Sequence, residues 1–303
     1  MKRRTFLKAI SAAGIGSYFL GNGFLKKTNL SSLFAQEGPY DIAMVKNPNP
    51  EDAVIKAVEL VGGIGRFISK GDVVMIKPNL GWARTPDQAA NTDPEVLKTV
   101  IGLCFNAGAK KVEITDNTCN DPRKTFALSG AEKVAKETGA DIFYSDEWEF
   151  KEMNINGRKI KEWPVNQKIM KADKIINLPI AKDHSLSRLT IGMKNWFGAV
   201  GGNRHQLHQD INQTIADLAH FFKPALTIVD AIRILVKNGP TGGNLNDVKR
   251  MNTIIASVDP VAADSLAATL FGLKGTDLGY VVIGEKMGIG TADYNKLKFK
   301  EIT

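Results

Sequence analysis

The chain contains little cysteine: Cys104 and Cys119 are the only two in 303 residues. A four-iron cluster held by one chain needs four thiolates, so a cluster bound by this chain's own cysteines is excluded. Cys104 lies in the apolar helical run VLKTVIGLCFNAG, which favours a buried free thiol. An oxidising compartment would permit a bridge between the two cysteines, and the sequence leaves that alternative open.

Several well-defined motifs are also missing. The sequence has no H-E-x-x-H zinc motif, no G-x-x-x-x-G-K-[ST] phosphate loop and no G-x-G-x-x-G fingerprint. Their absence removes the standard signatures of zinc proteases, P-loop proteins and dinucleotide-binding enzymes. No apolar run reaches the roughly 20 residues that a spanning helix needs. We therefore expect no stable membrane span in the mature protein.

The excess of basic residues is confined to the N-terminus. The chain has 40 basic and 32 acidic residues, a net charge of +8. Six of the basic residues lie within residues 1–35, which contain no acidic residue, so residues 36–303 carry 34 basic and 32 acidic side chains. A nucleic-acid-binding domain would need a basic face of its own. We therefore expect no nucleic-acid partner.

The first 35 residues resemble an export signal. Arg3-Arg4 is followed by Phe6-Leu7-Lys8 and a weakly apolar run of about 12 residues. This order is typical of a twin-arginine (Tat) signal, which implies the Tat translocase as a partner and a periplasmic or cell-envelope location. Ala35 is the expected cleavage position, although Leu33 departs from the small-x-small pattern, so a retained anchor is the alternative. Residues 36–303 are then expected to form one domain.

Short β-rich runs alternate with helical patterns along these residues. We expect strands at 41–45, 73–76, 111–115, 141–145, 174–178, 225–229 and 253–258. Helices are expected near 51–68, 94–107, 124–138, 210–222 and 260–271. The alternation predicts an α/β fold with a largely parallel sheet flanked by helices. Asn156-Gly157 within residues 149–163 predicts a small β-hairpin excursion from that sheet.

Polar side chains follow several of the expected strands. Lys77-Pro78-Asn79 follows 73–76, Asp116 follows 111–115, and Lys182 and His184 follow 174–178. Asp230 and Asp259 follow the last two strands, and Asp259 is equally suited to cap the next helix. The carboxyl ends of parallel strands meet at the edge where such sheets bind ligands. These residues are therefore candidates for one common site.

Lysines and glycines indicate what this site would bind. If Lys77, Lys182 and Lys194 converge, they would hold a carboxylate or phosphate, and their proximity would lower the pKa of an amine enough for it to act as a base or nucleophile. Three separately solvated surface lysines are the alternative. The glycine-rich pieces 197–203 and 238–244 suit exposed backbone N–H groups that favour anions, although plain turns are the alternative. Candidate ligand contacts here are Gly201, Gly202, Gly239, Thr241 and Gly243.

Three of the four histidines fall between residues 184 and 208. His205 and His208 are spaced to face the same way on one helical turn, and His184 follows a strand end. The sequence leaves three roles open: ligands of a divalent metal, uncharged acid–base groups, or structural side chains. His220 lies in an apolar helical pattern and is expected to pack.

Six segments in order along the chain resemble the domain-of-unknown-function 362 (DUF362) family. They are VVMIKPNLG, GAKKVEITD, the stretch from ADKIINLPIAKDHS to GGNRHQLH, IVDAI, NGPTGG and VDPVAADSLAA. The resemblance implies a site that includes Lys77, Pro78, Asn79, Asp116, Lys182, His184, Lys194, Asn195, Gly198, His205, His208, Asp230, Gly239, Thr241, Gly243, Asp259 and Asp264. It implies no particular reaction.

Taken together, the residues predict an exported enzyme that acts on a small anionic substrate, either metal-assisted or redox. The predicted catalytic groups are Lys77, Asp116, Lys182, His184, Lys194 and His205, with Asn79, Asn195 and Asp230 among the substrate contacts. Two alternatives stay open: a periplasmic solute- or metal-binding protein without catalysis, and an electron-transfer or maturation partner linked to an iron–sulfur protein.

Overall fold

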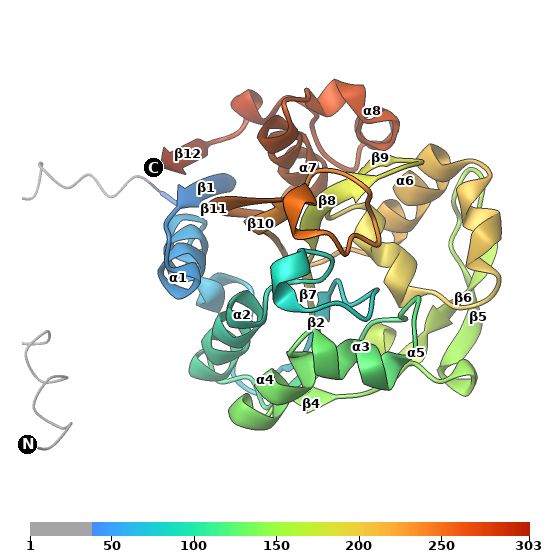
Figure 1. Ribbon diagram of the computed structural model, residues 1–303, viewed down its shortest axis with the longest axis horizontal. Coiled ribbons are helices and arrows are strands. Elements are labelled where there is room, and N and C mark those ends of the chain that lie inside the picture. The colour runs from blue at the N-terminus through green and yellow to red at the C-terminus, as the bar shows by residue number, and fades with distance from the viewer. Residues whose placement is uncertain (1–37) are drawn as a thin grey trace, which may run out of the picture. The chain divides into compact units, whose positions relative to one another are not determined.

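A mixed sheet of ten strands runs through the protein (Figure 1). The computed structural model describes residues 38–303; the signal expected in residues 1–35 lies outside this range. The central path of the sheet follows the order β12-β1-β11-β10-β7-β2-β3-β4, and β8 pairs with β10 and β9. Its strands are β1 (Ile42–Lys46), β2 (Val73–Pro78), β3 (Lys111–Ile114), β4 (Asp141–Ile142), β7 (Lys174–Leu178), β8 (Ile180–His184), β9 (Arg188–Thr190), β10 (Leu226–Leu235), β11 (Val248–Ser257) and β12 (Phe299–Ile302).

Most neighbours in this sheet are parallel, as the alternation of helices and strands predicted. The pairs β2–β3, β2–β7, β3–β4, β7–β10, β8–β10 and β1–β12 are parallel. Strand β11 is antiparallel to both β1 and β10, and β9 is antiparallel to β8. The parallel strands β2, β3 and β7 therefore end at the same edge, where polar side chains can meet.

Helices cover both faces of the sheet. Helices α1 (Pro50–Leu60), α2 (Pro94–Asn106), α3 (Pro122–Leu128) and α4 (Ala131–Thr138) contribute buried residues to the core on one face. The core on the other face is built by α6 (Ile211–Phe221), α7 (Pro260–Ala268) and α8 (Gly279–Lys286), with the short α5 (Gln167–Lys171) beside the hairpin. Strand residues alternate between these cores: Met75 packs in one, Val74 and Ile76 in the other.

Helix starts were predicted better than helix lengths. Asp93 and Asp259 cap α2 and α7 through their carboxylates, with Pro at the first helical position of each. The helix expected over 124–138 is divided at Gly130, which adopts φ +82° between α3 and α4. The helix expected to reach residue 68 ends at Leu60, just before the positive-φ residues Gly62 and Gly63.

The expected hairpin is present but has a longer loop than Asn156-Gly157 predicts. Its strands are β5 (Phe150–Asn154) and β6 (Glu162–Asn166). The carboxylate of Asp217 on α6 accepts backbone N–H hydrogen bonds from Arg158, Lys159 and Ile160, at 2.7–2.9 Å. The loop is therefore shaped by a buried tertiary carboxylate rather than by a two-residue turn.

Residues Gly38–Thr303 form one compact unit by their internal contacts. Among the helices of this unit, none combines the length and the apolar character required to cross a membrane.

Candidate functional site

A cavity of about 690 Å³ lies at the carboxyl edge of the parallel strands. It is lined by residues that follow β2 and β3, by strand β8, and by two 3₁₀ helices, η5 (Lys194–Ala199) and η6 (Arg204–His208). A cavity of this size is typical of sites for small ligands and cofactors. Of the predicted residues, those that line it are Asn79, Asp116, Lys182, His184, Lys194, Asn195, Gly198, Gly202, His205 and His208.

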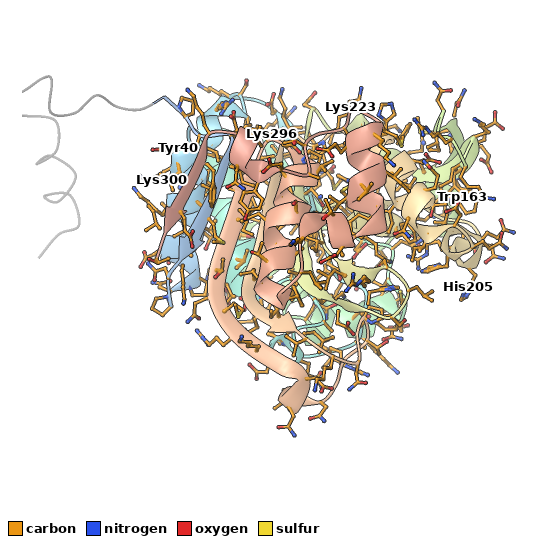
Figure 2. The ribbon with its side chains drawn as sticks, turned by 90° about the horizontal axis from the view of Figure 1, so that it is seen from above. Tyr40, Trp163, His205, Lys223, Lys296 and Lys300 are labelled. Atoms are coloured by element: carbon orange, nitrogen blue, oxygen red, sulfur yellow. The ribbon has the colours of Figure 1, made fainter. Side chains whose placement is uncertain are left out.

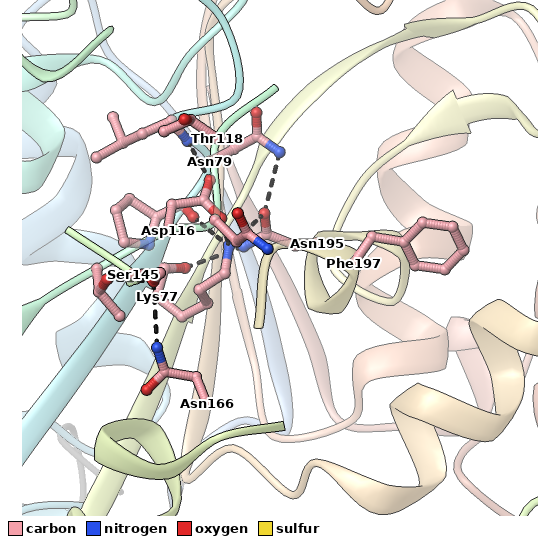
Figure 3. A network of polar contacts seen from close by, with 12 residues as sticks. Lys77, Asn79, Asp116, Thr118, Ser145, Asn166, Asn195 and Phe197 are labelled. Carbon is pink, nitrogen blue, oxygen red and sulfur yellow. Dashed lines mark hydrogen bonds and ion pairs between the residues drawn. The ribbon is translucent and has the colours of Figure 1, made fainter. Parts of the chain in front are cut away.

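A buried ion pair forms the base of the site. Lys77 Nζ lies 2.9 Å from Asp116 Oδ1, and both side chains are almost fully buried (Figure 3). The other carboxylate oxygen of Asp116 accepts a hydrogen bond of 2.6 Å from Leu80 N. Burial lowers the pKa of Lys77, and the neighbouring Asp116 opposes this lowering. Lys77 is thus neutralised by a partner, and it positions the end of β2 rather than offering a free charge.

Asn195 joins the ends of two neighbouring parallel strands. Its Nδ2 donates to Lys77 O on β2 at 3.0 Å and to Asn177 Oδ1 on β7 at 2.9 Å. Its Oδ1 accepts from Asn79 Nδ2 at 3.0 Å. Lys77 and Asn177 are register partners in the β2–β7 pair, so the side-chain amide of Asn195 bridges paired positions of the two strands. Asn195 therefore fixes η5 against the edge of the sheet.

Lys182 and Lys194 are buried amines that have no carboxylate partner within residues 38–303. Lys182 Nζ donates to Asn79 Oδ1 at 2.9 Å and to Ala90 O at 2.5 Å. Lys194 is only 7% exposed and lies over the ring of Phe197, 4.3 Å from its centroid. Its Nζ has no hydrogen-bond acceptor among residues 38–303. Burial lowers the pKa of both amines to about 7.

His184 and His208 are uncharged and carry their protons on opposite nitrogens. His184 Nδ1 accepts from the backbone N–H groups of Leu186 and Ser187, at 3.1 and 3.3 Å, so its proton is on Nε2. His208 Nδ1 lies 2.9 Å from Arg204 O, which can only accept, so His208 carries its proton on Nδ1 and a lone pair on Nε2. Burial, followed by the nearby Lys194, lowers the pKa of His184 to about 2, and burial lowers that of His208.

The three histidines do not gather around one point. The rings of His184 and His208 are stacked. His205 is exposed and lies at the same end of the molecule as Trp163 of the hairpin (Figure 2). In the described part of the chain, no three His, Cys, Asp or Glu side chains come close enough together to hold a metal ion. The metal site of His184, His205 and His208 stays a prediction that this arrangement does not support.

Several predicted ligand contacts do not reach the cavity. Asp230 lies inside β10 rather than after a strand; it accepts from Asp93 N and Ile232 N, and it holds the start of α2. Gly201 packs against Phe150, and Gly239 N donates to Asp183 Oδ2. Thr241 and Gly243 lie in the same loop as Pro240, which does line the cavity. Burial raises the pKa of Asp230 to about 7, with Asp93 adding to the effect.

The strand ends themselves were misplaced for a physical reason. Lys77 lies inside β2, and Lys182 and His184 belong to β8, a strand that we expected to be a loop. These strands contain buried polar side chains, so they break the apolar pattern by which strands are predicted. The polar residues nevertheless meet, because β2 pairs with β7, and β7 and β8 both pair with β10.

Some functional residues gave no signal in the sequence. Arg204 donates to Asn117 O at 2.7 Å and Thr118 O at 2.9 Å, which fixes the loop after β3 at the cavity wall. Phe197 supports Lys194, and its side chain points away from the polar network in Figure 3. Asn177 could have been noticed as the one amide within an apolar strand.

Two aspartates implied by the family resemblance lie outside the cavity, and one of them, Asp264, supports the start of η5. Asp264 on α7 accepts from Gly192 N at 2.8 Å and Met193 N at 3.0 Å, directly before η5. Its burial raises its pKa to about 7. Asp259 caps α7 and also accepts from Thr291 N at 2.9 Å. Neither side chain lines the cavity.

The fold and the site define an α/β protein with a cavity of buried lysines and uncharged histidines at the carboxyl edge of a mostly parallel sheet. The chain belongs to the DUF362 family: the model of this domain of unknown function matches residues 74–269. It is 27% identical over 240 residues to the thylakoid-associated protein sll1697 of Synechocystis sp.. The aligned region covers 77% of this chain and 73% of that protein.

Two solved structures are more distantly similar. The lactate racemase apoprotein of Thermoanaerobacterium thermosaccharolyticum aligns with a TM-score of 0.40 and 14% identity, over 64% of this chain and 50% of that chain. A Thermotoga maritima protein from a structural genomics consortium aligns with a TM-score of 0.39 and 12% identity, over 74% of this chain and 58% of that chain. This chain thus spans half to three fifths of the two solved chains.

Proposed function

We propose that the cavity binds a small anion, a carboxylate or a phosphate, and that the protein is an enzyme that moves protons on the bound molecule. One observation carries this proposal: Lys194 is 93% buried, lines the cavity and has neither a carboxylate nor a hydrogen-bond acceptor within residues 38–303. A buried amine without a partner is costly to the folded protein. An anionic ligand is the partner that would compensate this cost.

Lys182 supplies a second positive charge at the same cavity. Within residues 38–303 its amine is held by two neutral oxygens and forms no ion pair, and the nearby Lys194 adds to the lowering of its pKa by burial. Lys77 is different, since Asp116 already neutralises it. The anion is therefore assigned to Lys182 and Lys194, with Lys77, Asp116, Asn79 and Asn195 as the frame that positions them.

The histidine pair provides the proton-transfer groups. His208 presents a lone pair on Nε2 and can accept a proton, whereas His184 presents an N–H on Nε2 and can donate a hydrogen bond. Both rings line the cavity that holds the two lysines. A base and a hydrogen-bond donor beside an anion-binding pair are suited to removing a proton from carbon next to a carboxylate.

The proposal is tested with small carboxylates in D₂O. Wild-type protein is incubated with a panel of 2-hydroxy, 2-oxo and simple carboxylic acids, and exchange of carbon-bound hydrogen for deuterium is followed by NMR. The expected result is exchange in at least one class, lost in His208→Gln and in Lys194→Met and kept in Lys223→Met, a matched change of an exposed lysine (Figure 2). If a carboxylate binds but no carbon-bound hydrogen exchanges, the protein is a binding protein and the proposed enzyme activity is wrong.

We also propose that the protein is exported by the Tat route. Arg3-Arg4 ahead of a short apolar run supports this proposal. The test is fractionation of cells that express wild-type protein or Arg3→Lys, Arg4→Lys protein. Export of the wild type and retention of the double variant in the cytoplasm are expected; equal export of both would contradict the proposal.

A further inference from the structure

Cys119 is an exposed free thiol that lines the same cavity as Lys182 and Lys194. It lies in the loop that follows β3, three residues beyond Asp116. The function proposed above does not use this thiol. It shares the cavity with two amines that form no ion pair with a carboxylate of residues 38–303.

The loop holds Cys119 in place on both sides. Cys119 N donates to Gly81 O at 2.8 Å, and Arg204 Nη2 donates to the neighbouring Thr118 O at 2.9 Å. On the other side, Asn120 Oδ1 accepts from Ala83 N at 2.9 Å. The thiol is therefore presented to the cavity by a fixed backbone rather than by a loose loop.

Charge relates the thiol to both lysines. Burial is the main cause that lowers the pKa of Lys182 and of Lys194, and a thiolate at Cys119 is the charge that most strongly opposes this lowering in each. No carboxylate acts on them as strongly. The thiolate is the reactive form of cysteine, and an amine that takes up a proton beside it favours that form. Lys194, buried and without an acceptor of its own, is in addition free to hold a carboxylate of an incoming molecule.

We propose that Cys119 is a covalent capture site for carboxylate-bearing disulfides, with the carboxylate held by Lys182 and Lys194 while the thiolate attacks a disulfide sulfur. The Cys119 sulfur forms a bond to one sulfur of the ligand as the ligand's S–S bond breaks. The electron pair of that bond leaves with the second sulfur as a free thiolate. Cys119 is oxidised to a mixed disulfide and half of the ligand is reduced, so no further oxidant is needed.

Only one thiol of residues 38–303 is available for this reaction. Cys104 is fully buried on α2, and burial raises its pKa to about 12. The inference rests on the proposed anion site, because the same two lysines select the ligand. It goes beyond that site by adding a covalent bond and a class of ligand, the anionic low-molecular-weight disulfide.

The test compares three symmetric disulfides of similar length. These are 3,3′-dithiodipropionate, which is anionic, 2-hydroxyethyl disulfide, which is neutral, and cystamine, which is cationic. Rates of mixed-disulfide formation are measured by intact-mass spectrometry on the full chain, folded and in urea. The unfolded protein gives the intrinsic preference of its thiols. Folded protein is expected to favour the anionic over the cationic disulfide at least about tenfold more than unfolded protein does.

Variants separate the lysines from general effects of the surface. Lys194→Met should remove most of the preference, Lys223→Met should keep it, and Cys119→Ser should abolish labelling of the folded protein. Sulfate should slow the anionic reagent and leave the neutral one unchanged. A folded protein with the preference of the unfolded one would overturn the inference, as would a preference that Lys194→Met does not change.

Sulfate binding to Cys119→Ser protein distinguishes this inference from the proposed function. If sulfate binds to that variant and the wild type shows no charge preference, the capture site is wrong and the anion site stands. If sulfate does not bind and no charge preference is seen, both are wrong.

Discussion

The rings of His184 and His208 stack with centroids 6.2 Å apart and planes 14° apart, and their Nδ1 atoms make opposite kinds of hydrogen bond. Backbone N–H groups can only donate and a carbonyl oxygen can only accept, so the protein backbone fixes the tautomer of each ring. One Nε2 carries a proton and the other carries a lone pair. A donor and an acceptor are thus placed at one cavity without any charge on either ring.

The first prediction concerns these tautomers. At pH 5, where an ordinary histidine with a pKa of about 6.5 is mostly charged, His184 should still be neutral because burial and Lys194 lower its pKa to about 2. Two-bond ¹H–¹⁵N correlation spectra should show its proton on Nε2 and that of His208 on Nδ1 at pH 7.5. A His184 signal that titrates near pH 6.5 would contradict the assignment.

A second prediction tests the buried ion pair through a glycine. An added Cβ at Gly198 would overlap Asp116 Oδ1 and lie 2.9 Å from Lys77 Nζ. Gly198→Ala should therefore separate Lys77 from Asp116 and lower the free energy of unfolding by about 3 kcal/mol. Gly102→Ala is the control, because a Cβ there meets nothing within 4 Å and α2 should gain up to about 1 kcal/mol. Equal effects of the two changes in urea unfolding would contradict the packing described.

The hairpin supplies a third prediction. Asp217→Ala removes the acceptor of three backbone amides in the loop 155–161, so these amides should lose hydrogen-exchange protection and unfolding should become easier by about 2–3 kcal/mol. Gln213→Ala removes only the single hydrogen bond of 2.8 Å from Gln213 Nε2 to Asp217. Its expected cost is about 1 kcal/mol or less. An Asp217→Ala protein whose loop exchanges as slowly as the wild type would be the contrary result.

A fourth prediction links the binding lysine to stability. Lys194→Met removes a buried amine that lacks a partner, so the ligand-free variant should be more stable than wild type by about 1–3 kcal/mol at pH 6.5. The pKa of Lys194 is lowered from 10.5 to about 7 on folding, so the unfolded chain binds more protons between these values and wild-type stability rises with pH there.

The difference in free energy of unfolding between Lys194→Met and wild type should therefore become smaller as the pH rises from 7 to about 10. Urea unfolding at pH 6.5 and pH 9.5 measures it, with Lys223→Met as the control that should track the wild type at both values. A variant that is less stable than wild type at pH 6.5, or an advantage that grows with pH, would show that Lys194 has a partner in the folded protein.

Periodicity and helix caps were enough to predict the α/β class and most strands. The runs 73–76, 111–115 and 174–178 are apolar and short, and Asp93 and Asp259 mark helix starts by a local rule. Strands β8, β9 and β12 were missed because they are short and their residues do not alternate clearly between apolar and polar. β8 carries Lys182 and His184 with the side chains buried, and such burial is stable only because Asn79, Ala90 and the 186–187 backbone supply partners.

The site was predicted as a set of residue types rather than as a geometry. Sequence position could place Lys182, His184, Lys194 and His208 near one edge of a parallel sheet, since parallel strands share that edge. It could not separate Lys77, which Asp116 neutralises, from Lys194, which has no carboxylate partner among the described residues. That difference depends on distances between residues 39 and more positions apart.

Calorimetric titration with sulfate at pH 8 measures whether Lys182 and Lys194 together bind an anion. Sulfate keeps its two charges at this pH, whereas the two amines, with pKa values of about 7, are mostly neutral until an anion raises those values. Sulfate should bind with net uptake of protons, seen as a heat that depends on the ionisation enthalpy of the buffer. Binding should weaken as pH rises, and Lys194→Met should lose it while Lys223→Met keeps it. Sulfate that binds equally to wild type and Lys194→Met, or binds without taking up protons, would contradict the account.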